Sequence, residues 1–185
     1  FCIMKCKIIS ISHKPSDWEN QALQFYLKQL PNHFQISYVE VKPFSSNSMN
    51  IASILDAEAT EIIKHLDQDT HNILWDRKGQ KISSLSFAKL LQDQTDHGKN
   101  INFIIGGAHG ASEILFKASH LILSASDLTF THRLFKIFLM EQIYSCLLYT
   151  SDAADDSLRV DLGGRRIIKK CQPCCRLHCA RSRVG

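Results

Sequence analysis

The stretch that decides the fold is residues 101–144, INFIIGGAHGASEILFKASHLILSASDLTFTHRLFKIFLMEQIY. Its first five residues form an apolar run of strand length that ends at a glycine pair, which is typical of a buried strand followed by a turn. A short helix, a second apolar strand, a loop rich in Ser and Thr, and an amphipathic helix follow in that order. Strands that alternate with helices predict a parallel sheet.

The glycine pair, Gly106 and Gly107, stands at the carboxyl end of the first strand, where open α/β sheets bind their ligands. A residue without a side chain lets a ligand approach the backbone closely, although the same pair also suits an ordinary strand-to-helix turn. The later loop, residues 124–132, offers many hydroxyl and backbone groups and little charge. Because such a loop suits a neutral heterocycle better than a phosphate, the pattern predicts a neutral ligand at the strand ends.

The alternation of strands and helices extends toward the amino terminus. Strands are predicted at residues 5–12, 34–41 and 73–75, the last followed by a turn at 76–79; helices are predicted at residues 17–30 and 51–66 and from a Ser83 or Ser84 cap through Leu91. The expected fold class is therefore α/β, with one parallel sheet flanked by helices. The pattern alone cannot reveal whether the chain is knotted.

Charge and cysteine are unevenly distributed. Residues 1–144 carry 14 Lys and Arg against 14 Asp and Glu, whereas residues 145–185 carry 8 basic and 4 acidic residues and five of the seven cysteines. The composition therefore breaks near residue 145. No apolar run is long enough to span a bilayer and no signal-peptide pattern is present, so we expect a cytoplasmic protein without a membrane segment.

The segment after residue 145 has two interpretations. The run CLLYTSDAADD is typical of translated sequencing-adapter DNA, so we expect residues 145–185 to be a non-native or disordered tail without metal. The alternative is a zinc module, because Cys171, Cys174, Cys175, His178 and Cys179 supply thiolate and imidazole ligands. Basic residues around them would suit nucleic acid, which makes a non-catalytic nucleic-acid-binding protein the alternative function.

Several motifs, taken in order, resemble one family. They are the early pair Asp17-Trp18, IIGGAHG at residues 104–110, the Ser/Thr loop at 124–132, and EQIY at 141–144. Over about residues 4–144 the chain resembles the RlmH family of SPOUT methyltransferases. The resemblance implies a C-terminal trefoil knot, a homodimer, and S-adenosylmethionine-dependent methylation of N3 of a pseudouridine in the large-subunit ribosomal RNA within the ribosome.

The resemblance also implies which residues hold the cofactor. They lie in three loops that follow strands: Leu74 and Trp75 with Asp76; Gly106 and Gly107; and Ser126, Asp127, Leu128, Thr129, Phe130 and Thr131. His132 is the candidate catalytic residue, since an imidazole titrates near neutral pH. Each has a purely structural alternative: Trp75 as core, the hydroxyls as partners of loop backbone, and His132 as a residue of the helix start.

This chain departs from the family pattern at three places. Ala108-His109 stands where the family has Pro-Glu, Thr131 stands where the family has Pro, and the family's His-Pro-Tyr-His-like tail does not follow Tyr144. We therefore expect the chain to bind the cofactor and to transfer methyl groups poorly.

Overall fold

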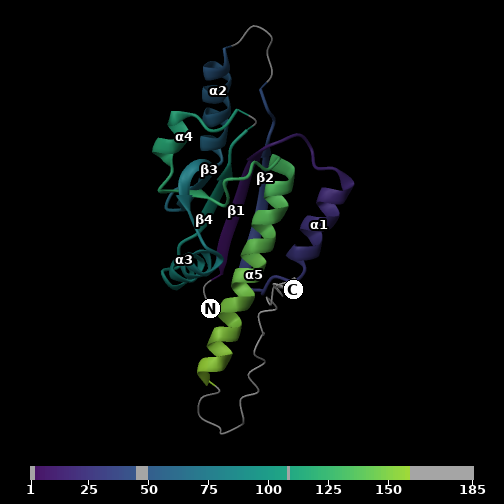
Figure 1. Ribbon diagram of the computed structural model, residues 1–185, viewed down its shortest axis with the longest axis vertical. Helices are drawn as coiled ribbons and strands as arrows, with labels where there is room; N and C mark the ends of the chain where they lie inside the picture. Colours follow the sequence, from purple (N-terminus) through teal and green to yellow (C-terminus); the bar gives the residue numbers. More distant parts are fainter. Residues whose placement is uncertain (1–2, 45–49, 108, 159–185) are drawn as a thin grey trace, which may run out of the picture.

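The computed structural model describes residues 3–44, 50–107 and 109–158 of the 185. Over these ranges the chain forms five strands and five helices (Figure 1). The strands are β1 Met4–Ile11, β2 Phe34–Val41, β3 His71–Lys81, β4 Ile101–Ile105 and β5 Leu121–Ser124; the helices are α1 Asp17–Leu27, α2 Ile51–Lys64, α3 Ser84–Asp96, α4 Glu113–Ala118 and α5 His132–Leu158. The Cys/His-rich segment in which a zinc module was the alternative lies outside the described residues.

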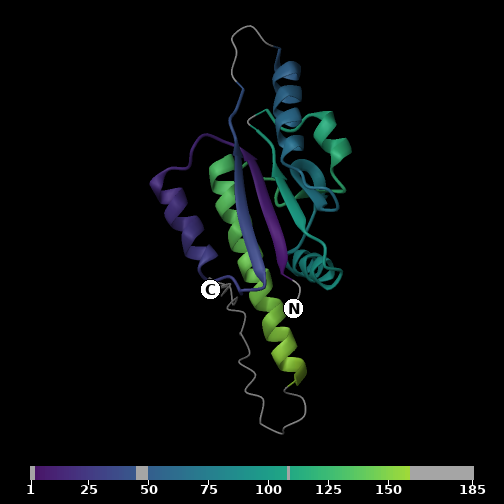
Figure 2. The ribbon, with the colours of Figure 1, turned by 180° about the vertical axis from the view of Figure 1, so that it is seen from behind.

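The strands form one parallel sheet in the order β2-β1-β4-β3-β5. Helices cover both of its faces, as the front and back views show (Figure 1, Figure 2). One face packs against α3 and α5 through a core that includes Phe103, Phe87 and Ile143, and the other packs against α2 and α4 through Ile62 and Leu115. The predicted α/β class with a flanked parallel sheet is confirmed, and the trefoil knot stays a prediction.

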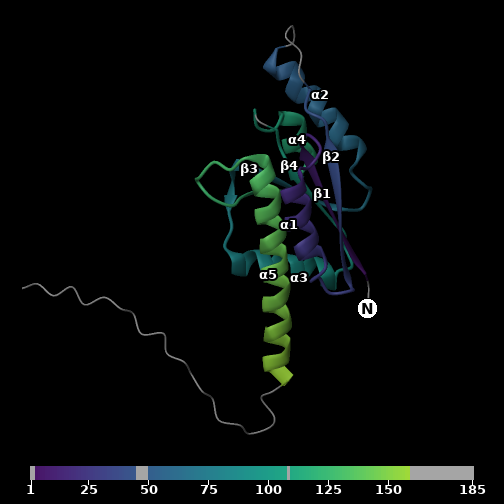
Figure 3. The same ribbon diagram turned by 90° about the vertical axis from the view of Figure 1, so that its right-hand side faces the viewer.

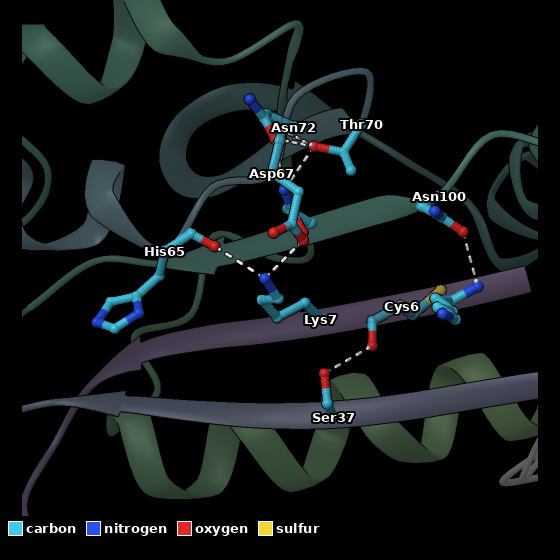
Figure 4. A network of polar contacts seen from close by, with 10 residues as sticks. Cys6, Lys7, Ser37, His65, Asp67, Thr70, Asn72 and Asn100 are labelled. Atoms are coloured by element: carbon cyan, nitrogen blue, oxygen red, sulfur yellow. Dashed lines mark hydrogen bonds and ion pairs between the residues drawn. The ribbon is translucent and has the colours of Figure 1, made fainter.

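The central strand β4 is buried throughout, as its apolar run predicts. Its one polar side chain, Asn102, is satisfied, because Nδ2 donates to Oγ1 of Thr70 at 2.6 Å and to Oδ1 of Asn72 at 2.9 Å. Nearby on β1, Nζ of Lys7 donates to the carboxylate of Asp67 at 2.6 Å (Figure 4). These contacts join β1, β3 and β4 near the amino-terminal end of the sheet, away from the strand ends at which a ligand is expected.

The predicted turn at residues 76–79 is wrong, because β3 continues to Lys81. Trp75 and Gln80 both pair with Leu123 of β5, so the residues between them form an irregularity within the strand. A Cβ at Gly79 would lie 2.5 Å from the carbonyl carbon of Leu123. The strand therefore resumes its pairing only because a glycine permits this close approach.

Helix ends differ from the predicted ones, as is usual where tertiary packing decides them. Helix α1 ends at Leu27 rather than Leu30, and α3 extends to Asp96 rather than Leu91. Helix α5 passes through the composition break and reaches Leu158, with Cys146 buried in the core. The carboxyl-terminal half of α5 extends beyond the sheet (Figure 3).

None of the helices in the described part of the chain is both long enough and apolar enough to cross a bilayer.

Candidate functional site

A cavity of about 570 Å³ lies beside the irregular part of β3 and the carboxyl ends of β4 and β5. It is bounded by the irregular part of β3, the glycine turn after β4, the loop after β5 and the first turn of α5. Its volume falls within the range of small-molecule sites, roughly 300–1,000 Å³. Its position is the one that open α/β sheets use for ligands.

Nine of the twelve predicted site residues line this cavity. They are Trp75, Asp76, Gly106, Gly107, Ser126, Leu128, Thr129, Phe130 and His132. They come from three segments that are far apart in the sequence, at residues 75–76, 106–107 and 126–132, and the fold brings them to one end of the sheet.

The remaining three predicted residues do not line the cavity. Leu74 is fully buried in the core on the α2 side of the sheet. Asp127 is exposed and forms an ion pair with Lys81. Thr131 precedes α5, where its Oγ1 accepts a hydrogen bond from the backbone N–H of Leu134 at 3.4 Å. In this structure the three residues therefore have core, surface and helix-capping positions.

The glycine pair forms a tight turn in which close contacts with neighbouring residues of the protein favour small side chains. The N–H of Gly110 donates to the carbonyl of Gly107 at 3.0 Å, and Gly110 has a φ of 91°. A Cβ at Gly106 would lie 3.1 Å from the carbonyl oxygen of Gly110. A Cβ at Gly107 would lie 3.0 Å from Oε2 of Glu58 and 3.4 Å from Cδ1 of Ile11. Packing against α2 and β1 thus favours a glycine at 107 whether or not a ligand is bound, a reason that the sequence did not indicate.

Glu58 lies behind this glycine turn. Its side chain is buried, and Oε1 accepts a hydrogen bond from the backbone N–H of Phe44 at 3.2 Å. Burial raises the pKa of Glu58 above its ordinary value, although the Phe44 hydrogen bond and the charge of His109 act in the opposite direction. Glu58 is therefore a buried carboxyl group that supports the turn from the side of α2.

In the loop after β5, hydroxyl groups bind loop backbone. Oγ of Ser124 donates to the carbonyl of Ser126 at 3.2 Å, and Oγ of Ser126 accepts from the N–H of Leu128 at 3.0 Å. Both serines therefore bind loop backbone, as the structural alternative expects, while Ser126 also lines the cavity and its role in cofactor binding stays a prediction. Farther along, the ring of Phe130 stacks on that of Phe138 with centroids 5.5 Å apart, which joins the loop to α5.

Trp75 is both core and cavity wall. Its side chain is 7% exposed and meets Phe87 and Phe135 edge-on, each with ring centroids 5.6 Å apart. Its Nε1 has no hydrogen-bond partner among the described residues. The indole therefore forms a rigid aromatic wall at the base of the site.

His132 is the first residue of α5 and is partly buried against the cavity. Burial lowers the pKa of its imidazole below the ordinary value. The neutral form therefore dominates at pH 7, and a neutral imidazole is able to accept a proton. Its position at the helix start fits both the chemical and the structural alternative.

The cavity also has charged lining residues that the sequence analysis did not select. Arg77 and Lys78 are exposed on the irregular part of β3, and Nζ of Lys78 lies 6.0 Å from the ring centroid of Phe116. His109, in the glycine turn, is a further lining residue. Arg77 and Lys78 closely follow the buried residues of β3, in the segment that the sequence predicts to be a turn. Their place at the end of a buried run is the signal that could have identified them.

Comparison with known proteins agrees with this geometry. The family described as "Predicted SPOUT methyltransferase" matches residues 4–150. "Ribosomal RNA large subunit methyltransferase H" of Caldicellulosiruptor bescii is 37% identical over 139 residues, which cover 75% of this chain and 90% of the relative. The proteins of the same name from Caldicellulosiruptor saccharolyticus and Methylobacillus flagellatus are 34% and 31% identical, covering 75% and 76% of this chain and 90% and 91% of their own lengths.

The family match spans the sheet, the cavity and the first turns of α5. The relatives match over nearly their whole length at more than 30% identity. The chain therefore belongs to the RlmH family of SPOUT methyltransferases.

Proposed function

We propose that this chain is an S-adenosylmethionine-dependent methyltransferase that acts on N3 of a pseudouridine in large-subunit ribosomal RNA. The observation that carries the proposal is the cavity at the strand ends, in a chain whose relatives are named ribosomal RNA large subunit methyltransferases. We further propose that the protein acts as a homodimer in the cytoplasm, on the assembled ribosome.

The cavity fits an adenosine-containing cofactor in size and in chemistry. It combines aromatic and aliphatic walls, at Trp75, Leu128 and Phe130, with the exposed backbone of a glycine turn. Apolar faces can pack against a purine ring, while backbone N–H and C=O groups read its polar edge. Trp75, Gly106, Gly107 and the lining residues of the loop after β5 are the residues that would hold the cofactor. When bound, S-adenosylmethionine supplies a methyl group activated by its sulfonium.

The protein's own contribution would be to position the target base and to take its proton. N3 of a pseudouridine must lose a proton when it is methylated, so a group that accepts protons near pH 7 is useful at the cavity. His132 meets that requirement, because burial keeps its imidazole neutral. Holding the two reactants in line carries much of the rate in such transfers.

The charge of the chain supports a structured target over naked RNA. Residues 1–144 carry equal numbers of basic and acidic side chains, so their net charge contributes little to gripping free RNA. Arg77 and Lys78 are exposed at the cavity, where they could contact one or two phosphates. Recognition by shape, on an assembled ribosomal surface, suits a protein with so little net charge.

The test is methyl transfer to ribosomes that lack the modification, compared with free RNA of the same sequence. Because the family's tail does not follow Tyr144, the assay uses two chains, the one described and one with a family-like tail joined after Tyr144. We expect transfer to ribosomes from the tailed chain, little from the described chain, and none to free RNA. Equal activity on free RNA would contradict the ribosome as substrate, and absence of transfer by the tailed chain would contradict the reaction.

Cofactor binding is tested separately by fluorescence. The chain has two tryptophans, and Trp18 is 51% exposed whereas Trp75 lines the cavity. In a Trp18→Phe variant, S-adenosylhomocysteine should change the emission of Trp75 with saturation at one site per subunit. Emission that stays constant while calorimetry detects binding would place the cofactor away from Trp75.

A further inference from the structure

The first turns of α5 carry two charged side chains that do not belong to the cavity. Lys136 is 1% exposed, and its Nζ donates to Oε1 of Glu40 on β2 at 2.8 Å. The glutamate side chain is itself only 23% exposed. An ion pair between a helix and a strand is thus largely removed from water, one turn beyond His132.

A second ion pair joins the same turn of α5 to α1. Nη1 of Arg133 lies 3.5 Å from Oε2 of Glu19, a residue that is 1% exposed. That oxygen also accepts hydrogen bonds from the N–H and Oγ–H of Ser16, at 2.8 and 2.6 Å. Burial acts to raise the pKa of Glu19, but the Ser16 hydrogen bonds and the charges of Arg133 and Lys136 outweigh it, and the pKa lies below its ordinary value. Glu19 is therefore ionised and complements the two cations of α5.

The apolar residues that α5 packs against the core repeat along one side of the helix. Phe135, Leu139 and Ile143 follow one another at four-residue intervals and all belong to the core or pack against it. A shift of about one helical turn, roughly 5.4 Å, would put one large apolar side chain in the place of the next. The same shift would leave Lys136 buried without its carboxylate, and a buried charge that loses its partner is strongly destabilising.

We propose that Lys136 and Glu40 are positioning residues, whose buried ion pair sets the register of α5 on the sheet and thereby holds His132 and Phe135 at the cavity. The proposal builds on the proposed function only in treating that cavity as the ligand site. A pair of this kind need not add stability, because apolar replacements of buried ion pairs are often neutral or stabilising.

The test follows the titration of His132 by NMR in the full chain, without cofactor or RNA. The nine histidines are distinguished by comparison with His132→Gln. If the ion pair acts on His132 only through its charges, Lys136→Met should raise the pKa of His132 and Glu40→Gln should lower it. If the pair sets the register, both variants should move the pKa upward, toward the ordinary value of about 6.5, because the imidazole leaves its buried site.

The double variant Glu40→Gln/Lys136→Met removes both charges together and leaves no buried lysine unpaired, so it stays informative if Glu40→Gln fails to fold. We expect it to show the raised His132 pKa, and we expect Lys136→Arg to retain the wild-type value. The matched control is the exposed pair Glu61 and Lys64, 2.7 Å apart on α2, whose neutralisation should leave His132 unchanged. A wild-type His132 pKa in the double variant would overturn the proposal, whatever the outcome of the methyl-transfer assay.

Discussion

Gly79 and Gly107 both lack room for a methyl group, but for different physical reasons. A Cβ at Gly79 would lie 2.5 Å from the backbone of Leu123, which cannot move without breaking the pairing of β3 with β5. A Cβ at Gly107 would instead meet the end of the Glu58 side chain, which is able to shift. Because the neighbour of Gly79 is rigid backbone and the neighbour of Gly107 is a flexible side chain, we expect a change to alanine to lower the free energy of unfolding more at position 79 than at position 107.

We expect Gly79→Ala to lower the free energy of unfolding by about 3 kcal/mol and Gly107→Ala by about 1 kcal/mol. Urea unfolding followed by circular dichroism measures both. In a Glu58→Ala background, Gly107→Ala should lower the free energy of unfolding by less, because the carboxylate that the added methyl group meets is removed. Equal losses at the two glycines would show that the contact of Gly79 with Leu123 is not rigid.

The lowered pKa of His132 makes the stability of the folded protein depend on pH in a direction that can be predicted. Its pKa is lower in the folded chain than the ordinary value, so the unfolded chain binds a proton first as the pH falls. The free energy of unfolding should therefore decline as the pH falls below about 6.5, and the decline should end below the folded-state pKa. His71, whose pKa is lowered by burial and by the charges of His120 and Lys99, adds to the same trend.

The check is urea unfolding at several values between about pH 5 and pH 7.5 for the wild type, His132→Gln and His71→Gln. In each variant the free energy of unfolding should still decline as the pH falls, but by less than in the wild type. A decline that is unchanged in His132→Gln would mean that its imidazole is not desolvated by folding.

At the scale of elements, α5 packs one of its sides against the core of the molecule and exposes another. Ile143 is fully buried against the sheet, whereas Leu148, five residues later, is 48% exposed. The two residues thus test whether α5 packs in the register described, since a shifted helix would bury different side chains.

Ile143→Ala should cost about 2–5 kcal/mol, because it removes buried methyl groups and leaves a cavity, whereas Leu148→Ala should cost less than about 1 kcal/mol. Both are measured by urea unfolding. Comparable costs would place the end of α5 in an interface, and the dependence of the Leu148→Ala effect on protein concentration would then test the proposed homodimer.

At the scale of the whole molecule, the cavity is built entirely from residues 75–135, and the family match ends at residue 150. A chain ending at Leu158 should therefore bind S-adenosylhomocysteine with the affinity of the 185-residue chain and should contain no zinc. Calorimetry and metal analysis of both chains provide the comparison. Stoichiometric zinc in the longer chain, with tighter binding of nucleic acid, would favour the alternative in which the Cys/His-rich segment is a functional module.

Local sequence determined the elements that are strongly patterned, and it did so for physical reasons. The apolar run at residues 101–105 can be satisfied only by burial on both faces, so a central strand was predictable, as was a cavity beside Gly106 and Gly107. The motifs at residues 104–110 and 124–132 contain twelve of the twenty residues that line the cavity, and seven of these twelve were predicted as site residues.

Other features were decided only by the tertiary structure, because they depend on groups distant in the sequence. The continuation of β3 through residues 76–79 is fixed by pairing with Leu123, and local signals there indicated a turn. The preference for glycine at 107 comes from Glu58 on another element, and the burial of Lys136 depends on Glu40, 96 residues away. Sequence periodicity indicates which side of an element is apolar, but it carries no information on which distant charge or backbone atom will lie opposite that element. Such distant groups determine the final geometry of the site, so only the tertiary structure shows it.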